Sequence, residues 1–272
     1  MKLIVEMFSY PFLARAALSG TVVSVCAALL GVSLVLKRFS MIGDGLSHIG
    51  FGALAIATAL NASPVALSIP AVVVSAFLLL RISQNSSVRG DAAIAMISTA
   101  ALAAGVLAIS LKSGINIDIS SYLFGSILAM RLEDVVLSLA LCVAVLILFV
   151  LFYNKLFAIT FDETFCAATG IKASGYNMVI AFLTAITIVL GMRMMGALLI
   201  SSLIIFPALT AMRICRRFLT VTLCAGAVSA ACFFIGLVLS YAYSLPTGAS
   251  VVLVNLAAFL LFALAGRLKG AA

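Results

Sequence analysis

The chain has 272 residues, of which 65% are hydrophobic and only 9% are charged, and its formal net charge is +8. A soluble domain has about 25% charged residues, so this composition excludes a soluble protein and predicts an integral membrane protein. In a membrane protein, an excess of lysine and arginine mostly marks cytoplasmic loops, and the charge therefore does not indicate a nucleic-acid partner. We expect a single all-α domain over residues 1–272, a polytopic helical bundle surrounded by membrane lipid.

Long apolar runs predict about nine transmembrane helices, because about 20 apolar residues cross a membrane. Residues 1–10 are weakly amphipathic and are expected to lie in the interface. Residues 112–134 contain scattered polar side chains. Within them, residues 119–130 are expected to lie at the membrane surface or to enter the membrane partway. The sixth and seventh predicted spans are separated only by Arg193. The spans are residues 16–36, 39–60, 65–80, 92–111, 135–154, 173–192, 194–212 and two within 218–266, divided by a turn at 244–248.

The loop charges predict the orientation of the bundle. With the amino terminus outside, eleven lysines and arginines fall on the cytoplasmic side and five on the outer side. Because positive loops stay inside, we expect an external amino terminus and a cytoplasmic carboxyl terminus.

The stretch GDGLSHIGFG, residues 43–52, holds the only histidine of the chain, four residues after an aspartate. On a helix, Asp44 and His48 lie one turn apart on the same face. The glycines leave room for another backbone to come close. Ionisable groups at membrane depth usually mark a pathway or a functional site, so this pair is our candidate metal site. The alternative is a histidine that only packs.

Residues 160–170, TFDETFCAATG, predict a short amphipathic helix on the cytoplasmic side. Thr160 and Glu163 have the spacing of a capping box, and Gly170 is a suitable C-terminal stop. One interpretation is a linker helix without a partner. The other is a docking helix whose apolar side chains enter a groove on a cytoplasmic protein. The candidate docking residues are Phe161, Asp162, Glu163, Phe165, Ala168 and Gly170.

Two more acidic residues are candidates for the entry or the pathway of an ion. Asp91 begins the fourth predicted span, where a carboxylate that is simply solvated at the cytoplasmic face is the favoured interpretation. Asp118 falls in the outer segment, where it could help to receive an ion or a delivery protein.

Several enzyme classes are excluded by absent motifs. The chain has no GxxxxGK[ST] phosphate loop, so it is not itself a P-loop ATPase, and one histidine cannot form HExxH. It has no GxSxG, and its six cysteines include no CxxC pair. We therefore do not expect an enzyme.

The sequence resembles the membrane permease subunit of bacterial ATP-binding-cassette (ABC) importers for zinc and manganese. LLGVSLVLKRFSMIGDGLSHIGFGALAIA resembles the most specific stretch of that family, a basic turn followed by Asp-x-x-x-His. DISSYLFGSIL, FDETFCAATGI, MRMMGALLISSLIIFPALTA and PTGASVVLVN are similar to further family segments, in the expected order.

This resemblance implies a type II ABC importer fold, shared with permeases for iron-siderophores and cobalamin, in the bacterial inner membrane. It implies a homodimer, two cytoplasmic ABC ATPase subunits and an external metal-binding protein, with residues 160–170 as the coupling helix. Asp44 and His48 become the metal-contacting pair for a transported divalent ion, zinc first and manganese next, without a tightly bound cofactor. The alternatives are a stand-alone ion channel or secondary transporter, and a purely structural membrane subunit.

Overall fold

Every regular element in the described part of the chain is an α-helix. The computed structural model describes residues 7, 9–85, 90–112 and 132–270. Asp118 and the 119–130 segment lie outside these residues. The all-α prediction is confirmed for the part that is described. The helices are α2 (Pro11–Leu36), α3 (Ser40–Ala59), α4 (Pro64–Asn85), α5 (Gly90–Leu111), α7 (Leu132–Leu151), α8 (Tyr153–Phe161), α9 (Glu163–Ala168), α10 (Ala173–Met195), α11 (Ala197–Met212), α12 (Phe218–Tyr243) and α13 (Thr247–Gly270).

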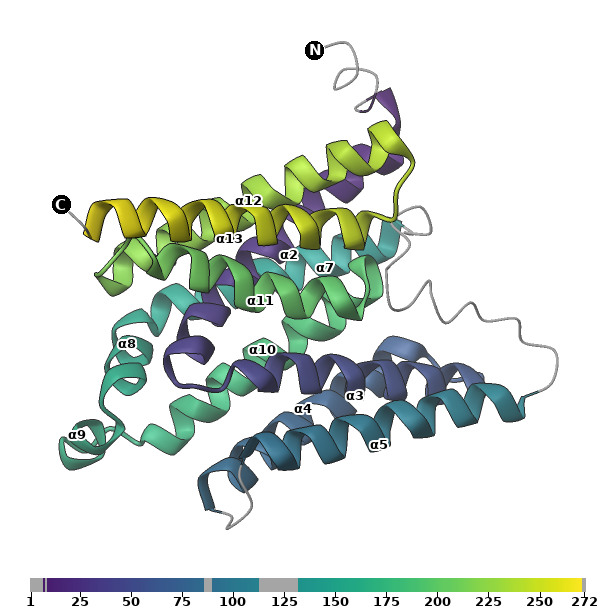
Figure 1. Ribbon diagram of the computed structural model, residues 1–272. Coiled ribbons are helices and arrows are strands. Elements are labelled where there is room, and N and C mark those ends of the chain that lie inside the picture. Colours follow the sequence, from purple (N-terminus) through teal and green to yellow (C-terminus); the bar gives the residue numbers. More distant parts are fainter. Residues whose placement is uncertain (1–6, 8, 86–89, 113–131, 271–272) are drawn as a thin grey trace.

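The helices form two packed groups, which are connected by α10 and by the contact of α11 with α3 (Figure 1). In one group α2 contacts α7, α11 and α12, and α13 covers α11 and α12. In the other group α3 lies against both α4 and α5. Helix α10 contacts α2 and α11 on one side and α3 and α4 on the other. Most of α2 and α10 is buried, whereas α5 and α13 are peripheral and largely exposed, as expected of surfaces that face lipid or another chain.

The expected count of nine membrane spans is not confirmed by length and composition. Among the described residues, five helices are long and apolar enough to cross a membrane, or six if the bent α7–α8 pair is one span. Two further apolar segments, Ala66–Ile82 and Ala197–Met212, are shorter. Helix α3 is outside this set, because its glycines and the Asp44–His48 pair lower its hydropathy.

Several predicted boundaries were wrong. The break between the sixth and seventh predicted spans lies at Gly196, whose φ of 90° and ψ of 157° fall in a region that only glycine readily occupies. Arg193 stays inside α10, since an exposed charged side chain does not by itself end a helix. The predicted span 135–154 ends early, at Leu151, where the chain bends by 68° into α8. The predicted short span 65–80 extends to Asn85 despite the internal Pro70.

Candidate metal site and docking segment

Helix α3 holds Asp44 and His48 in the only part of its middle that other helices leave uncovered. From residue 42 to residue 55, every residue of α3 is buried except these two. Glycines allow the close packing on the other sides. A Cβ on Gly43 would lie 3.2 Å from a side chain of α11, one on Gly45 2.4 Å from α5, and one on Gly50 2.8 Å from α10. The neighbouring helices therefore leave one open direction, and the two ionisable side chains occupy it.

The pair has the geometry that the i, i+4 spacing predicts. His48 Nε2 lies 3.6 Å from Asp44 Oδ2, and the two side chains are 33% and 42% exposed, respectively. This distance is longer than an ordinary N–H···O hydrogen bond, so the two groups do not satisfy each other. His48 Nδ1 is buried and has no hydrogen-bond partner among the described residues. Of the two ring nitrogens, Nε2 is therefore the one that faces the carboxylate and remains available as a ligand.

One chain does not supply a complete coordination shell in its described part. Among the described residues, no group of three or more histidine, cysteine, aspartate or glutamate side chains could hold a metal ion. Zinc in proteins usually has four ligands, and a site from which an ion must leave needs fewer protein ligands or weaker ones. Asp44 and His48 can act as two ligands, and the remaining positions have to be filled from elsewhere.

The two additional acidic candidates are not joined to this pair. Asp91 is exposed in the first turn of α5. The close approach of Gly45 to Ile94 places this turn level with the beginning of α3. Asp118 lies outside the described residues, so its predicted role as an entry residue stays a prediction.

A short helix is present in the segment 160–170, as predicted, but its N-cap was predicted two residues too early. Thr160 lies inside α8, where its hydroxyl donates to the carbonyl oxygen of Leu156 at 2.6 Å. Asp162 is the N-cap of α9, and its Oδ1 accepts from the backbone N–H of Phe165 at 2.8 Å and from the hydroxyl of Thr164 at 2.7 Å. These hydrogen bonds lower the pKa of the Asp162 carboxyl. Aspartate is at least as good an N-cap as threonine, and here its extended backbone separates α8 from α9.

Gly170 ends this segment as predicted. Its φ is 83°, and its N–H donates to the carbonyl of Ala167 at 3.2 Å. The N–H of Ile171 donates to the carbonyl of Cys166 at 2.9 Å. This pair of bonds is a Schellman motif, which satisfies the last carbonyls of the helix. The helix itself, Glu163–Ala168, is shorter than the predicted 160–170 segment.

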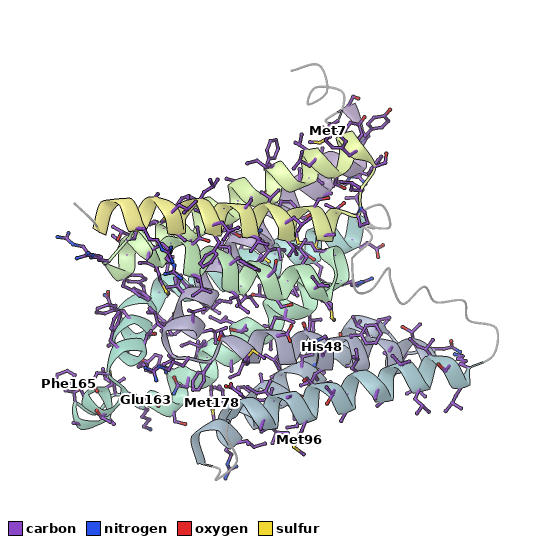
Figure 2. The ribbon with its side chains drawn as sticks, viewed as in Figure 1. Met7, His48, Met96, Glu163, Phe165 and Met178 are labelled. Carbon is purple, nitrogen blue, oxygen red and sulfur yellow. The ribbon has the colours of Figure 1, made fainter. Side chains whose placement is uncertain are left out.

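Large apolar side chains project from this segment at one end of the molecule (Figure 2). Phe165 is 64% exposed and Phe161 is 61% exposed, although the Phe161 ring also packs 5.0 Å from that of Phe157 and 6.0 Å from that of Phe218. Ala168 is exposed as well. Exposed phenylalanines beside a hydrogen-bonded, capped helix suit a contact with another protein better than an isolated linker.

Glu163 differs from the other candidates because it contacts the interior of the molecule. Its carboxylate reaches Lys37, in the turn before α3, and Asn177, in α10. Sequence reasoning missed Lys37 and Asn177 as functional candidates. Lys37 was counted as a positive loop residue and as part of the basic turn before Asp44, and no local pattern links it to a helix more than 120 residues away.

The chain is similar along nearly its whole length to known membrane proteins. Residues 9–266 match the model of the ABC 3 transport family. The manganese transport system membrane protein MntC of Halalkalibacterium halodurans is 32% identical over 96% of this chain and 88% of its own length. The high-affinity zinc uptake system membrane protein ZnuB of Haemophilus influenzae is 30% identical over 93% of this chain and 97% of its own length.

A solved structure confirms the architecture. PsaBC from Streptococcus pneumoniae, in complex with a Fab, superposes with a TM-score of 0.86 and 26% sequence identity, covering 96% of this chain and 94% of the matched chain. The predicted resemblance to metal-ion ABC permeases is confirmed, and these relatives are membrane subunits rather than enzymes. The chain therefore belongs to the ABC 3 transport family and is a multi-pass membrane permease.

Proposed function

We propose that this permease moves a divalent transition metal ion, with zinc preferred, into the cytoplasm, and that ATP hydrolysis on a separate subunit drives the movement. The observation that carries the proposal is the open pair in α3. Asp44 and His48 are the only residues in the middle of an otherwise buried helix that a molecule outside the chain can reach. A carboxylate and an imidazole together are a ligand set for a transition metal rather than for an alkali ion.

The choice of zinc over manganese rests on the imidazole. Neutral histidine suits zinc, whereas manganese sites are dominated by carboxylate, carbonyl and water oxygens. In each chain, the Nε2 of His48 offers the metal one nitrogen ligand beside the carboxylate of Asp44. The relatives include both a manganese and a zinc transport protein at similar identity, so the metal has to be identified by uptake.

A second copy of the chain would complete the site. Two chains related by a twofold axis along the pathway would present two Asp44 and two His48 side chains, which is the number of ligands that a tetrahedral zinc ion needs. Such a symmetric contact would also cover part of the exposed apolar surface. The proposal therefore includes a homodimer.

The proposed partners are two cytoplasmic ABC ATPase subunits and an external metal-binding protein. The ATPase would dock on the exposed phenylalanines of α8 and α9, Phe161 and Phe165. With the amino terminus outside, this segment lies in the cytoplasm, as ATP-driven coupling requires. The external protein would deliver the ion at the opposite end of the bundle.

The test is metal accumulation in metal-starved cells that express the permease with its ATPase and binding protein. Zinc, manganese and iron would be supplied separately, and uptake measured with and without ATP depletion. We expect selective, ATP-dependent zinc uptake. Selective manganese uptake would refute the zinc preference, and uptake that persists without ATP would favour a channel or a secondary transporter.

Substitutions at the pair test the site itself. Asp44→Asn and His48→Ala should each lower uptake at equal membrane abundance, because each removes one ligand. Ser47→Ala is the matched control, since Ser47 is buried next to both residues and its hydroxyl bonds only within α3, to the carbonyl of Asp44 at 2.7 Å. Metal uptake that survives when Asp44→Asn and His48→Ala are combined in one chain would show that the pair is not the site. Asp91→Asn, tested in parallel, would show whether that exposed carboxylate belongs to the pathway.

A further inference from the structure

Three polar side chains from distant parts of the chain form a closed triangle beneath the docking segment. Lys37 Nζ donates to Asn177 Oδ1 and lies 3.5 Å from Glu163 Oε2. Asn177 Nδ2 donates in turn to Glu163 Oε1 at 2.8 Å. Each residue therefore contacts the other two, and the triangle joins the α2–α3 turn, the first residue of α9 and the first half of α10.

The triangle is mostly shielded from water. The side chain of Lys37 is only 6% exposed, Asn177 is 4% exposed, and the Glu163 side chain is 44% exposed. Burial lowers the pKa of the Lys37 ammonium, and the nearby Glu163 carboxylate opposes that shift. A cation this far from water depends on its partners, because each lost contact leaves charge without compensation. Removing one partner should therefore cost more here than at an exposed ion pair.

On the α9 side, Glu163 belongs to the segment proposed to dock the ATPase. Apart from Cys166, which packs with Ile159 and Ala173, the residues of α9 are exposed. Glu163 adds a contact that reaches beyond α8 and α10 to the turn between α2 and α3. Figure 2 shows Glu163 and Phe165 together at the α9 end of the molecule, with His48 deeper in the bundle.

On the other side, Lys37 belongs to a tight turn that leads directly into α3. The N–H of Phe39 donates to the carbonyl of Leu34 at 2.8 Å, and that of Arg38 donates to the carbonyl of Val35 at 3.0 Å. Arg38 has a φ of 61°, in the left-handed region, which this hydrogen-bonded turn stabilises. Helix α3 begins at Ser40, two residues after Arg38, and Asp44 lies in its second turn. These hydrogen bonds tie Lys37 to the start of α3 through a short turn.

We propose that Lys37, Asn177 and Glu163 are positioning residues that couple the ATPase-docking helix α9 to α3, so that a movement of α9 shifts Asp44 and His48. This inference rests on the proposed function, because it assigns the route by which ATP hydrolysis reaches the metal pair. None of the three residues needs to touch the metal or the ATPase for this role.

The experiment compares Lys37→Met and Asn177→Leu with the wild-type permease, each reconstituted in proteoliposomes with its ATPase subunit and binding protein. Both substitutions keep the approximate side-chain length, and Lys37→Met leaves no buried charge. Lys172→Met is the control, because Lys172 is an exposed lysine at the start of α10 outside the triangle. Metal uptake, ATP hydrolysis and co-purification of the ATPase are measured on the same samples.

We expect both variants to bind the ATPase and hydrolyse ATP while the metal moved per ATP falls at least about fivefold, the lower range of coupling between sites. Lys172→Met should match the wild type. Hydrogen exchange gives a readout that does not depend on transport. ATPase binding should protect both residues 163–168 and residues 37–44 in the wild type, but only residues 163–168 in Lys37→Met.

A wild-type ratio of metal to ATP in both variants would overturn the inference. A parallel loss of uptake and ATPase binding would also overturn it, because the triangle would then only hold the docking surface. If the wild-type permease itself binds no ATPase or moves no metal, the proposed function fails first, and this inference fails with it.

Discussion

A close backbone contact of α3 with α5 provides a direct test of how the proposed metal pair, Asp44 and His48, is positioned. Gly52 and Gly105 face each other across this contact. A Cβ on Gly52 would lie 2.3 Å from the carbonyl oxygen of Ala101, and one on Gly105 would lie 2.7 Å from Gly52 Cα. These obstacles are backbone atoms, which cannot rotate away as a side chain can. Gly52→Ala therefore forces the two helices apart.

The structure sets the size of the effect. A carbon atom rarely approaches a carbonyl oxygen closer than about 3.3 Å, so the helices must separate by roughly 1 Å near Gly52. Overpacking of this kind costs about 1–3 kcal/mol. From the middle of this range, about 2 kcal/mol, alanine regains up to about 1 kcal/mol through its helix propensity, which leaves a net loss of about 1–2 kcal/mol. At about 2–4 °C for each kcal/mol, we expect the Tm to fall by about 2–8 °C.

Gly226→Ala is the matched control, because Gly226 is also a buried glycine within a long helix. There an added Cβ would lie 3.7 Å from the nearest side chains, which is an ordinary contact. The assay is thermal unfolding of both purified variants in the same detergent, together with metal uptake. Gly226→Ala should keep or raise the Tm, and Gly52→Ala should lower both the Tm and uptake. Equal Tm values for the two variants would refute the close approach of α3 to α5.

Two other glycines give predictions through backbone conformation. Gly196→Ala should lower stability by about 1–3 kcal/mol, because φ 90° with ψ 157° is accessible essentially only to glycine; an unchanged Tm would contradict the observed break between α10 and α11. Gly170→Val should weaken ATPase co-purification by straining the end of α9, since a left-handed residue costs about 1–2 kcal/mol. Gly170→Asn should be milder, because asparagine tolerates that region and no atom lies within 4 Å of the added Cβ. Equal binding by the two Gly170 variants would count against this explanation.

These predictions separate two requirements of the same helix. Glycines bring α3 close to its neighbours and leave Asp44 and His48 as its accessible central residues. Substituting a glycine disturbs the position of the pair and the stability of the bundle together. Substituting Asp44 or His48 removes a proposed ligand from a side that is already open, and so should affect transport with little effect on stability.

Local patterns in the sequence were sufficient for much of the architecture. Long apolar runs predict helices because each span must satisfy its own backbone in lipid. The i, i+4 spacing places Asp44 beside His48 on any helix, and the structure has this arrangement. The stop at Gly170 was also predictable, since glycine is the residue that most readily adopts a positive φ.

Competition between local signals could not be resolved from the sequence. Thr160 and Asp162 can both cap a helix, and only the fold shows that the first continues α8 while the second begins α9. Arg193 and Gly196 both resemble a break between spans. The helix continues through the arginine and ends where the backbone takes a conformation that only glycine readily adopts.

The sequence by itself determined that the chain is a helical membrane protein with one histidine–aspartate pair and a capped surface segment, because these features depend on composition and on residues within one helical turn. Tertiary structure alone decided which side of α3 is open and that Glu163 turns inward. The bond from Lys37 to Asn177 joins residues 140 positions apart. No local preference encodes such a contact, which exists only because the packing of α2, α9 and α10 brings a lysine and its partners together away from water.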